Sequence, residues 1–362
     1  MPTSRLASFF QCPKTIWPWS EPNLSIGLDM DSQAITFVEF RNRQGRQYLK
    51  QWGFEKLATN IVQDGRIKNR SALLSVLTPF VGKYKLRGAS VAMGINGASV
   101  MVKRISIPRC HQHDLDEYVM WEAPQYIPYD PEDVYLDFSQ CSSRVLGATD
   151  EDMDLLLVAA KREAVDERRD VLEAAKLRPV ICDVDGLAFL NWTSMNELVQ
   201  YHRTYLVAHF RERMMNVAVV VQGEPLLVRD VSFSSVSNQD VETMIPTGIA
   251  PVSWGNGEQS AYDIESSQSE KMLWLEILSE LKRTVEGTRE MLPALDIEKV
   301  FLAGHLAENF GLQEELRQGL SIPVCLLTST SPLKVNETKG GGQLLAPFAH
   351  MAEGLALRAL QG

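Results

Sequence analysis

Ser25-Ile26-Gly27-Leu28-Asp29 leads into the turn Met30-Asp31-Ser32-Gln33, and the chain returns through Ala34-Ile35-Thr36-Phe37-Val38-Glu39-Phe40. The apolar runs on either side predict a buried strand, a tight turn and a returning strand. Such turns hold polyphosphate through backbone N–H groups that must approach closely, so they favour glycine and small hydroxyl residues. Asp31 stands where glycine is expected. At an effective dielectric near 20, its charge about 5 Å from a phosphate charge costs roughly 3 kcal/mol, on the order of a hundredfold in affinity.

Length and composition predict a globular protein with two lobes. The chain has 362 residues, of which 45% are hydrophobic, enough for two cores of ordinary size. Its longest apolar stretches fall far short of the roughly 20 residues that span a bilayer. Residues 1–21 lack the pattern of a secretory signal, so we expect a cytoplasmic protein. The five cysteines are scattered, which predicts reduced thiols and no metal site.

The net charge of −10 is unevenly distributed, because residues 1–110 are basic and the remainder is acidic. This polarity is typical of a basic face directed at anionic lipid or an acidic partner, and an ordinary solvated surface explains it equally well. Nucleic acid is not an expected partner, because the overall balance is acidic and no basic-aromatic motif is present.

The second half of the chain repeats the opening pattern. Strands are predicted at Tyr205–Val207 and Met215–Val221, with a partner strand at Leu226–Val231, and this echo suggests a duplicated lobe. A helix is predicted from Ser71, as its cap, to Lys83. A second helix is predicted at about Glu270–Leu292.

Several segments together resemble one known family, the type IV pilus assembly protein PilM. They are Ile26-Gly27-Leu28-Asp29, Gln125-Tyr126-Ile127-Pro128-Tyr129, Glu132-Asp133-Val134-Tyr135-Leu136-Asp137-Phe138, Leu157-Val158-Ala159-Ala160 and Gly354-Leu355-Ala356-Leu357-Arg358. The resemblance is dense from about residue 24 to 192 and thinner beyond. The stretch from Gln125 to Phe138 is its most specific element, since a generic actin fold does not require it.

The resemblance implies an α/β fold of the actin-like ATPase (ribonuclease H-like) type, two-lobed, with a subdomain inserted in the first lobe as in FtsA. The implied divisions are a flexible N-terminal tail 1–22, a first lobe of 23–86 with 166–195 and 343–362, an inserted subdomain 87–165, and a second lobe 196–342 with an exposed loop 246–270.

The resemblance also implies a cytoplasmic adaptor that binds the N-terminal tail of a PilN-like bitopic inner-membrane protein. Membrane contact is then peripheral, through the partner, and pilus motor ATPases are further implied contacts. The expected partner groove holds Trp121, Gln125, Tyr126, Ile127 and Tyr129. Extended peptides gain affinity from main-chain hydrogen bonds, and aromatic anchors carry binding energy. For each of these residues, packing within the inserted subdomain is the alternative.

ATP with Mg²⁺ is the cofactor that the resemblance implies. The matching positions are Gly27, Asp29 and Ser32 in the first phosphate loop, Glu280 and Arg283 on the helix beside adenine, and Gly304 on the adenosine side. Asp29 is the implied, weak Mg²⁺ position. None of these residues is expected to be catalytic.

Two departures from the family pattern argue against ATP hydrolysis. Asp31 replaces a glycine of the first phosphate loop, and the second loop, expected within Val207–Met214, is replaced by bulky side chains. Hydrolysis needs phosphates, metal and water held in register, so we predict a pseudo-ATPase. Asp31 is expected to serve the turn. Arg211 and Arg213 either contact an anionic ligand directly or, as we favour, belong to a solvated hairpin, and Asp185 is predicted to cap a helix starting at Gly186.

Three alternatives stay open at this point. The protein could be an ATP-binding, nucleotide-switched assembly ATPase of the same machine, in which case nucleotide and tail change each other's affinity. It could be the equivalent adaptor of a related type II secretion or adhesion-pilus system. Polymerisation, as in actin or FtsA, has little support in the sequence.

Overall fold

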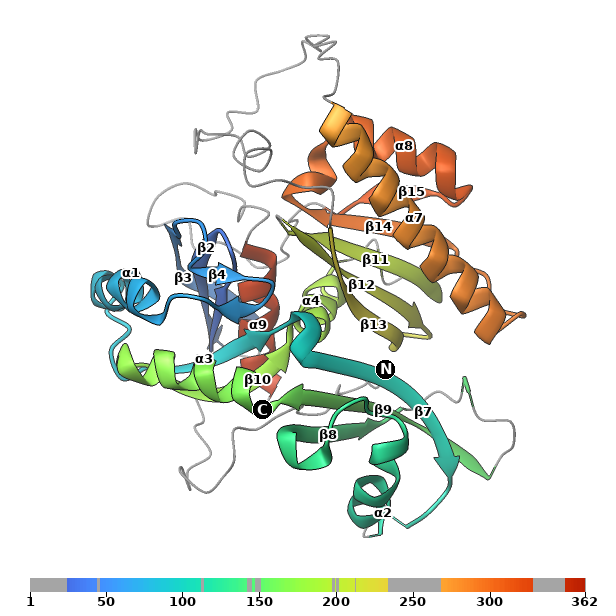
Figure 1. The fold of residues 1–362 in the computed structure, drawn as a ribbon, viewed down its shortest axis with the longest axis horizontal. Coiled ribbons are helices and arrows are strands. Elements are labelled where there is room, and N and C mark those ends of the chain that lie inside the picture. The colour runs from blue at the N-terminus through green and yellow to red at the C-terminus, as the bar shows by residue number, and fades with distance from the viewer. Residues whose placement is uncertain are drawn as a thin grey trace.

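A computed structural model describes residues 25–43, 46–111, 114–141, 145–146, 151–196, 199, 202–211, 213–233, 268–327 and 349–361. Within these residues the chain forms two large sheets with helices packed against them (Figure 1). The predicted tail 1–22 and nearly all of the predicted loop 246–270 lie outside the described residues.

The first sheet has five strands in the order β10-β6-β1-β2-β3. β1 and β2 pair antiparallel through the predicted turn, whereas β6 and β10 run parallel to β1. Every residue of β1 is buried, as expected for a central strand covered on both faces. The bounds are β1 Ile26–Met30, β2 Ala34–Arg43, β3 Arg46–Lys56, β6 Ser90–Ile95 and β10 Arg178–Val184.

Helices cover both faces of this sheet. On one face the rings of Phe80, in α1, and of Tyr84, the residue after α1, meet Phe37 of β2 edge-on. On the other face α9 packs against β1 and against α4, and Val38 of β2 joins its apolar cluster. The bounds are α1 Arg70–Lys83, α3 Arg162–Ala174, α4 Asp185–Ser194 and α9 His350–Gln361.

Asn69 begins α1, which corrects the predicted cap at Ser71. The Asn69 side chain accepts a hydrogen bond of 3.0 Å from the backbone N–H of Ala72. Asparagine at this position satisfies one of the free N–H groups of the first turn, and Ser71 then lies inside the helix.

The second sheet has eight strands in the order β15-β14-β11-β12-β13-β7-β9-β8. Helices α7, Gln268–Met291, and α8, Phe310–Leu320, pack against its β11, β12 and β14 part (Figure 1). The strand bounds are β7 Val100–Pro108, β8 Val134–Gln140, β9 Asp152–Lys161, β11 Thr204–Phe210, β12 Met214–Val221, β13 Glu224–Ser232, β14 Lys299–Gly304 and β15 Val324–Leu326.

The two sheets share a topology, as the repeated sequence pattern suggested. β11, β12 and β13 form an antiparallel meander with β14 parallel to β11, just as β1, β2 and β3 do with β6 parallel to β1. The connection between β1 and β2, which holds Asp31, therefore corresponds to the connection between β11 and β12, which begins at Arg211 and which we also call a turn.

The segment from β7 to β9 forms a unit with its own apolar cluster. Ile105, Val134 and Leu155 pack there with Leu115 of α2, which spans Leu115–Glu122. β7 also pairs with β13, so this segment continues the second sheet. β6, which falls within the predicted insertion 87–165, pairs in the first sheet. The division of the chain into lobes and insertion otherwise stays a prediction.

Among the described residues, no helix is both long and apolar enough to span a membrane.

Candidate functional site

Arg211 brings the two sheets together where the corresponding turns meet. Its Nη2 lies 3.2 Å from both carboxylate oxygens of Asp29 and 3.0 Å from Oδ2 of Asp185. Its Nη1 lies 3.7 Å from Oδ2 of Asp31. Only 5% of the Arg211 side chain is exposed. One guanidinium from the second sheet thus faces three carboxylates from the first.

The topology explains why these carboxylates gather. β1, β6 and β10 run parallel, so their carboxyl ends lie at one edge of the first sheet, the edge at which α/β proteins usually place ligands. Asp29 stands near the end of β1, and Asp185 follows β10 as the first residue of α4. Asn96 follows β6 and donates a side-chain hydrogen bond to Asp185.

Burial and charge act against each other in this cluster. Burial, reinforced by the charges of Asp185 and Asp31, raises the pKa of Asp29 to about 7, although Arg211 favours its charged form. Burial likewise opposes the charged form of Arg211, but the three carboxylates outweigh it and raise the pKa of Arg211 above its ordinary value. The guanidinium therefore stays charged and compensates the buried carboxylates.

Asp31 satisfies the turn with its own side chain. Its Oδ1 accepts hydrogen bonds of 2.8 Å from the backbone N–H groups of Gln33 and Ala34. The predicted role of Asp31 in the turn is thereby confirmed. The amides of this turn, which a phosphate would need, are already bonded to a carboxylate of the chain.

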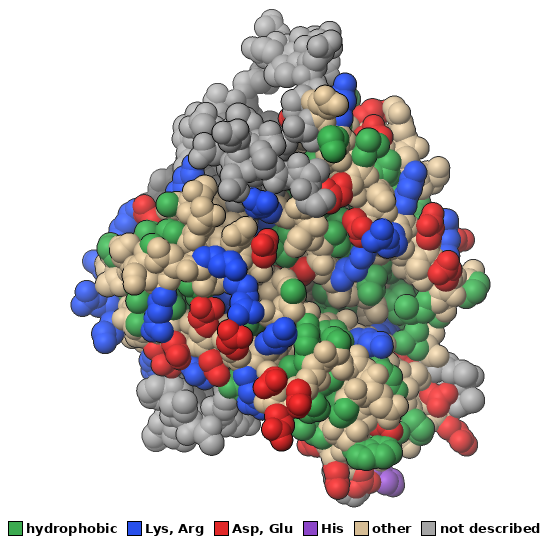
Figure 2. Space-filling view, in the orientation of Figure 1, with side chains coloured by type: hydrophobic (Ala, Val, Ile, Leu, Met, Phe, Trp, Pro, Cys, Tyr) green, Lys and Arg blue, Asp and Glu red, His purple; other side chains and the backbone are tan. Residues whose placement is uncertain are grey.

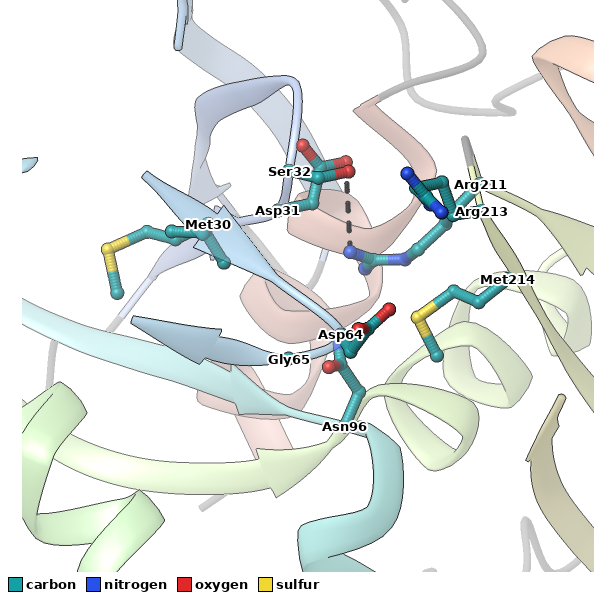
Figure 3. Close-up of a pocket in the computed structure, with 10 residues that line it drawn as sticks. Met30, Asp31, Ser32, Asp64, Gly65, Asn96, Arg211, Arg213 and Met214 are labelled. Atoms are coloured by element: carbon teal, nitrogen blue, oxygen red, sulfur yellow. Dashed lines mark ion pairs between the residues drawn. The ribbon is translucent and has the colours of Figure 1, made fainter. Parts of the chain in front are cut away.

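A small pocket lies beside this cluster, and Figure 3 shows Arg211 pointing across it toward Asp31. Its cavity volume is about 20 Å³, room for about one water molecule. It is lined by Met30, Asp31, Ser32, Val62, Asp64, Gly65, Asn96, Arg211, Arg213 and Met214.

The residues present do not fit ATP with Mg²⁺. Asp29, the implied metal position, is bonded to a guanidinium, and the turn that would hold phosphates is bonded to Asp31. Within the described part of the chain, no group of three or more His, Cys, Asp or Glu side chains is arranged to hold a metal ion.

Two expectations about this site are wrong. Arg211 does not belong to a solvated hairpin, because its side chain is buried between the sheets. Asp185 does not cap α4: Val184 holds the cap position, and Asp185 makes an ion pair with Arg211 instead.

Sequence reasoning missed Arg168, which supports the pocket from α3. Its Nη1 donates to the carbonyl of Met30 at 3.3 Å, and its Nη2 donates to the carbonyl of Gly65 at 2.9 Å. It also missed Asp230 of β13, which accepts hydrogen bonds of 2.6 Å from the Gly97 N–H and from the side chain of Asn216. No motif pointed to either residue.

The other predicted nucleotide positions are separated. Ser32 lines the pocket, but Gly27, Glu280, Arg283 and Gly304 do not. Glu280 accepts from Arg229 of β13 at 3.2 Å and pairs with Arg283 at 2.7 Å, so both predicted residues on α7 contribute to local ion pairs.

The two glycines have packing reasons of their own. A Cβ on Gly27 would lie 2.2 Å from the carbonyl oxygen of Ala352 in α9, so glycine lets that helix lie on β1. Gly304 has φ of +89°, and a Cβ there would lie 2.1 Å from the carbonyl oxygen of Phe210, directly before Arg211.

The predicted partner residues divide into exposed and buried ones. Trp121 is 72% exposed on α2, and Gln125 is exposed and bonded to Glu122. Tyr126 and Tyr129 are half-buried; Lys103 and Lys161 lie over their rings.

Ile127 does not belong with the exposed residues. Its side chain is 6% exposed and packs in the apolar cluster of the β7–β9 segment, so it holds the segment together and cannot face a partner. Its inclusion in the expected groove is therefore corrected.

A family model and a solved structure both point to one family. A family model described as "Type IV pilus assembly protein PilM" matches residues 27–250. A solved chain of the "PilM-PilN type IV pilus biogenesis complex" is similar over 94% of this chain and 99% of its own, at 22% identity and a TM-score of 0.75. The ethanolamine utilization protein EutJ from Carboxydothermus hydrogenoformans matches with 12% identity over 92% of this chain and 89% of its own, at a TM-score of 0.46. The high TM-score to the PilM chain supports the fold that the sequence implied, the two-lobed actin-like ATPase fold.

Proposed function

Because the chain belongs to the family of the type IV pilus assembly protein PilM, whose model matches residues 27–250, we propose that it is an adaptor of the pilus assembly platform that binds the cytoplasmic tail of a PilN-like membrane protein. A similar solved chain is described as part of a PilM–PilN complex, which supports this partner. On this proposal the protein sits in the cytoplasm and reaches the inner membrane only through that partner. Its task is protein binding.

The proposed contact surface lies on the β7–β9 segment. Met120 and Trp121 are large hydrophobic side chains exposed on α2, and hydrophobic side chains are visible at the lower end of the molecule in Figure 2. Exposed aromatic anchors of this kind often dominate binding energy. We propose that Trp121, Gln125, Tyr126 and Tyr129 contact the tail.

Tyr129 is held ready for such a contact. Its hydroxyl donates to the carbonyl of Ala98 at 2.9 Å, and the Lys161 ammonium lies 4.8 Å from its ring centre. A side chain fixed in this way loses little conformational freedom when a partner binds.

The observation that carries the second half of the proposal is the pairing of Arg211 with Asp29. We propose that the cleft between the two sheets, where Arg211 meets the carboxylates, is not an ATPase site. Asp29, the implied metal position, and the backbone amides after Asp31 are already bonded within the chain. The competing function, an ATP-dependent switch, requires Mg·ATP and the tail to alter each other's affinity by the same factor.

Titration calorimetry with a synthetic PilN-like tail peptide tests the adaptor proposal. We expect saturable binding that Trp121→Ala weakens by about tenfold or more, the loss of a binding hot spot. The matched control is Met291→Ala, an exposed apolar side chain on α7. Absence of peptide binding, or equal affinity for the wild type and Trp121→Ala, would contradict the proposal.

Saturating Mg·ATP should leave the peptide affinity unchanged. A change in affinity would favour the switch over the adaptor with a closed cleft.

A further inference from the structure

The two corresponding turns supply charged side chains to one another. Asp31, in the first turn, bonds the amides of its own turn and faces Arg211. Arg211, in the second turn, faces Asp29 and Asp185. An anion and a cation of the chain itself therefore face each other where the two turns meet.

We propose that Arg211 is an internal cation that latches the two sheets together across the cleft, with Asp31 as the internal anion, so that the cleft is held closed without any ligand. This inference goes beyond the adaptor proposal, because it concerns the conformation of the protein and needs neither partner nor nucleotide.

Charge accounting supports the latch. Asp29 and Asp185 are almost fully buried, and Asp31 is 19% exposed, so water screens their mutual repulsion weakly. Without Arg211, the three carboxylates would repel one another with no cation between them. Separation of the two turns is the simplest relief, since it lets water reach the carboxylates.

The shape of the guanidinium also matters. Its two terminal nitrogens reach carboxylates in different directions, Nη2 toward Asp29 and Asp185 and Nη1 toward Asp31. A lysine ammonium is a single point charge and cannot serve both directions at once. Arg211→Lys should therefore latch the cleft incompletely.

Local opening of this kind is measurable by hydrogen–deuterium exchange in the absence of ligands. The informative segments are residues 26–36 and 206–216, which contain the two turns. Arg211→Ala should exchange about a hundredfold faster in both segments, as expected when a buried ion pair is broken. Arg211→Lys should lie between this variant and the wild type. Arg213→Ala, in the same turn, should exchange like the wild type.

Asp230 of β13 provides a second connection to the segment after β6, because it accepts a hydrogen bond from the Gly97 N–H, and substitutions of Arg211 do not remove this bond. We therefore expect exchange to increase more in the two turns than in residues 217–232 of β12 and β13.

Arg211→Lys keeps the test valid if Arg211→Ala does not fold, because it retains a positive charge among the carboxylates but not the two-directional guanidinium. Faster exchange in both turns supports the latch. Exchange as slow as in the wild type in any folded variant that lacks Arg211 would overturn it.

The latch and the adaptor proposal can fail independently. Hydrogen–deuterium exchange without ligands tests the latch, whereas the peptide titration alone tests the adaptor proposal.

Discussion

Arg211 and Asp29 face each other across the two sheets, with one guanidinium nitrogen 3.2 Å from both carboxylate oxygens. Asp29 lies near the end of β1, and Arg211 directly follows the end of β11, and these are the first strands of two antiparallel meanders of the same topology. The fold thus brings a guanidinium from the second sheet onto a carboxylate at the carboxyl end of β1 in the first sheet.

Loss of the guanidinium should destabilise the protein strongly. Arg211→Met is expected to lower the free energy of unfolding by about 3–5 kcal/mol, because it leaves uncompensated buried carboxylates. Urea denaturation measures this loss. Arg213→Met is the matched control, with an expected loss of less than about 1 kcal/mol, since Arg213 is partly exposed. Equal losses in both variants would contradict the assignment of Arg211.

Gly27 is expected to matter for packing. Gly27→Ala should lower the free energy of unfolding by about 1–3 kcal/mol, because its Cβ would lie 2.2 Å from the Ala352 carbonyl oxygen and force α9 away from β1.

Gly82→Ala is the control for this substitution, since nothing lies within 4 Å of its Cβ position on α1. It should stabilise the helix by roughly 0.5–1 kcal/mol. Thermal unfolding of both variants checks the pair, and a neutral Gly27→Ala would argue against the tight contact.

Stability should fall as the pH rises from 7 to 8. Burial raises the pKa of Glu353 in α9 to about 8, against the opposing effect of the Trp192 side chain. The folded state therefore retains a proton that the unfolded state releases near its ordinary pKa of 4.5, and the free energy of unfolding falls by about 1 kcal/mol per pH unit until about pH 8.

Other buried groups act mainly at lower pH. Burial lowers the pKa of His350 to about 3, so its contribution rises with pH and is complete above its ordinary value of 6.5. Because burial raises the pKa of Asp29 to about 7, Asp29 makes the free energy of unfolding fall as the pH rises toward about 7. Between pH 7 and 8 Glu353 therefore makes the larger contribution to the slope measured by urea denaturation, and a variant of Glu353 separates it from the remaining titration of Asp29.

Glu353→Gln should flatten this pH dependence and raise stability at pH 8. Glu286→Gln, at an exposed position of α7, should keep the wild-type slope. A Glu353→Gln protein with the wild-type slope would contradict the assignment.

The sequence predicted the strands and their repetition well, because strand burial and turn chemistry are local properties. The strands predicted at residues 25–29 and at Met215–Val221 are observed at Ile26–Met30 and Met214–Val221. The role of Asp31 could also be predicted, since aspartate commonly bonds the amides that follow it in a turn.

The role of Arg211 could not be predicted in the same way. An arginine after a strand is usually solvated, and its burial depends on carboxylates that lie 182 and 26 residues away in the chain, at Asp29 and Asp185. Asp185 was misjudged for the same reason: its place after β10 is a local property, whereas its partner comes from the other sheet. The partner residues could be predicted only in part, because Trp121 and Ile127 are both large and apolar in the sequence, and only the packing shows that Trp121 is exposed and Ile127 buried.

Calorimetric titration of Mg·ATP into the wild-type protein, with Asp31→Gly alongside it, tests the closed cleft most directly. We predict no binding to either protein, because Asp31→Gly frees the turn amides but leaves Arg211 on Asp29. Micromolar binding to the wild type would contradict a cleft that Arg211 and Asp31 hold closed, and it would favour an ATP-dependent switch.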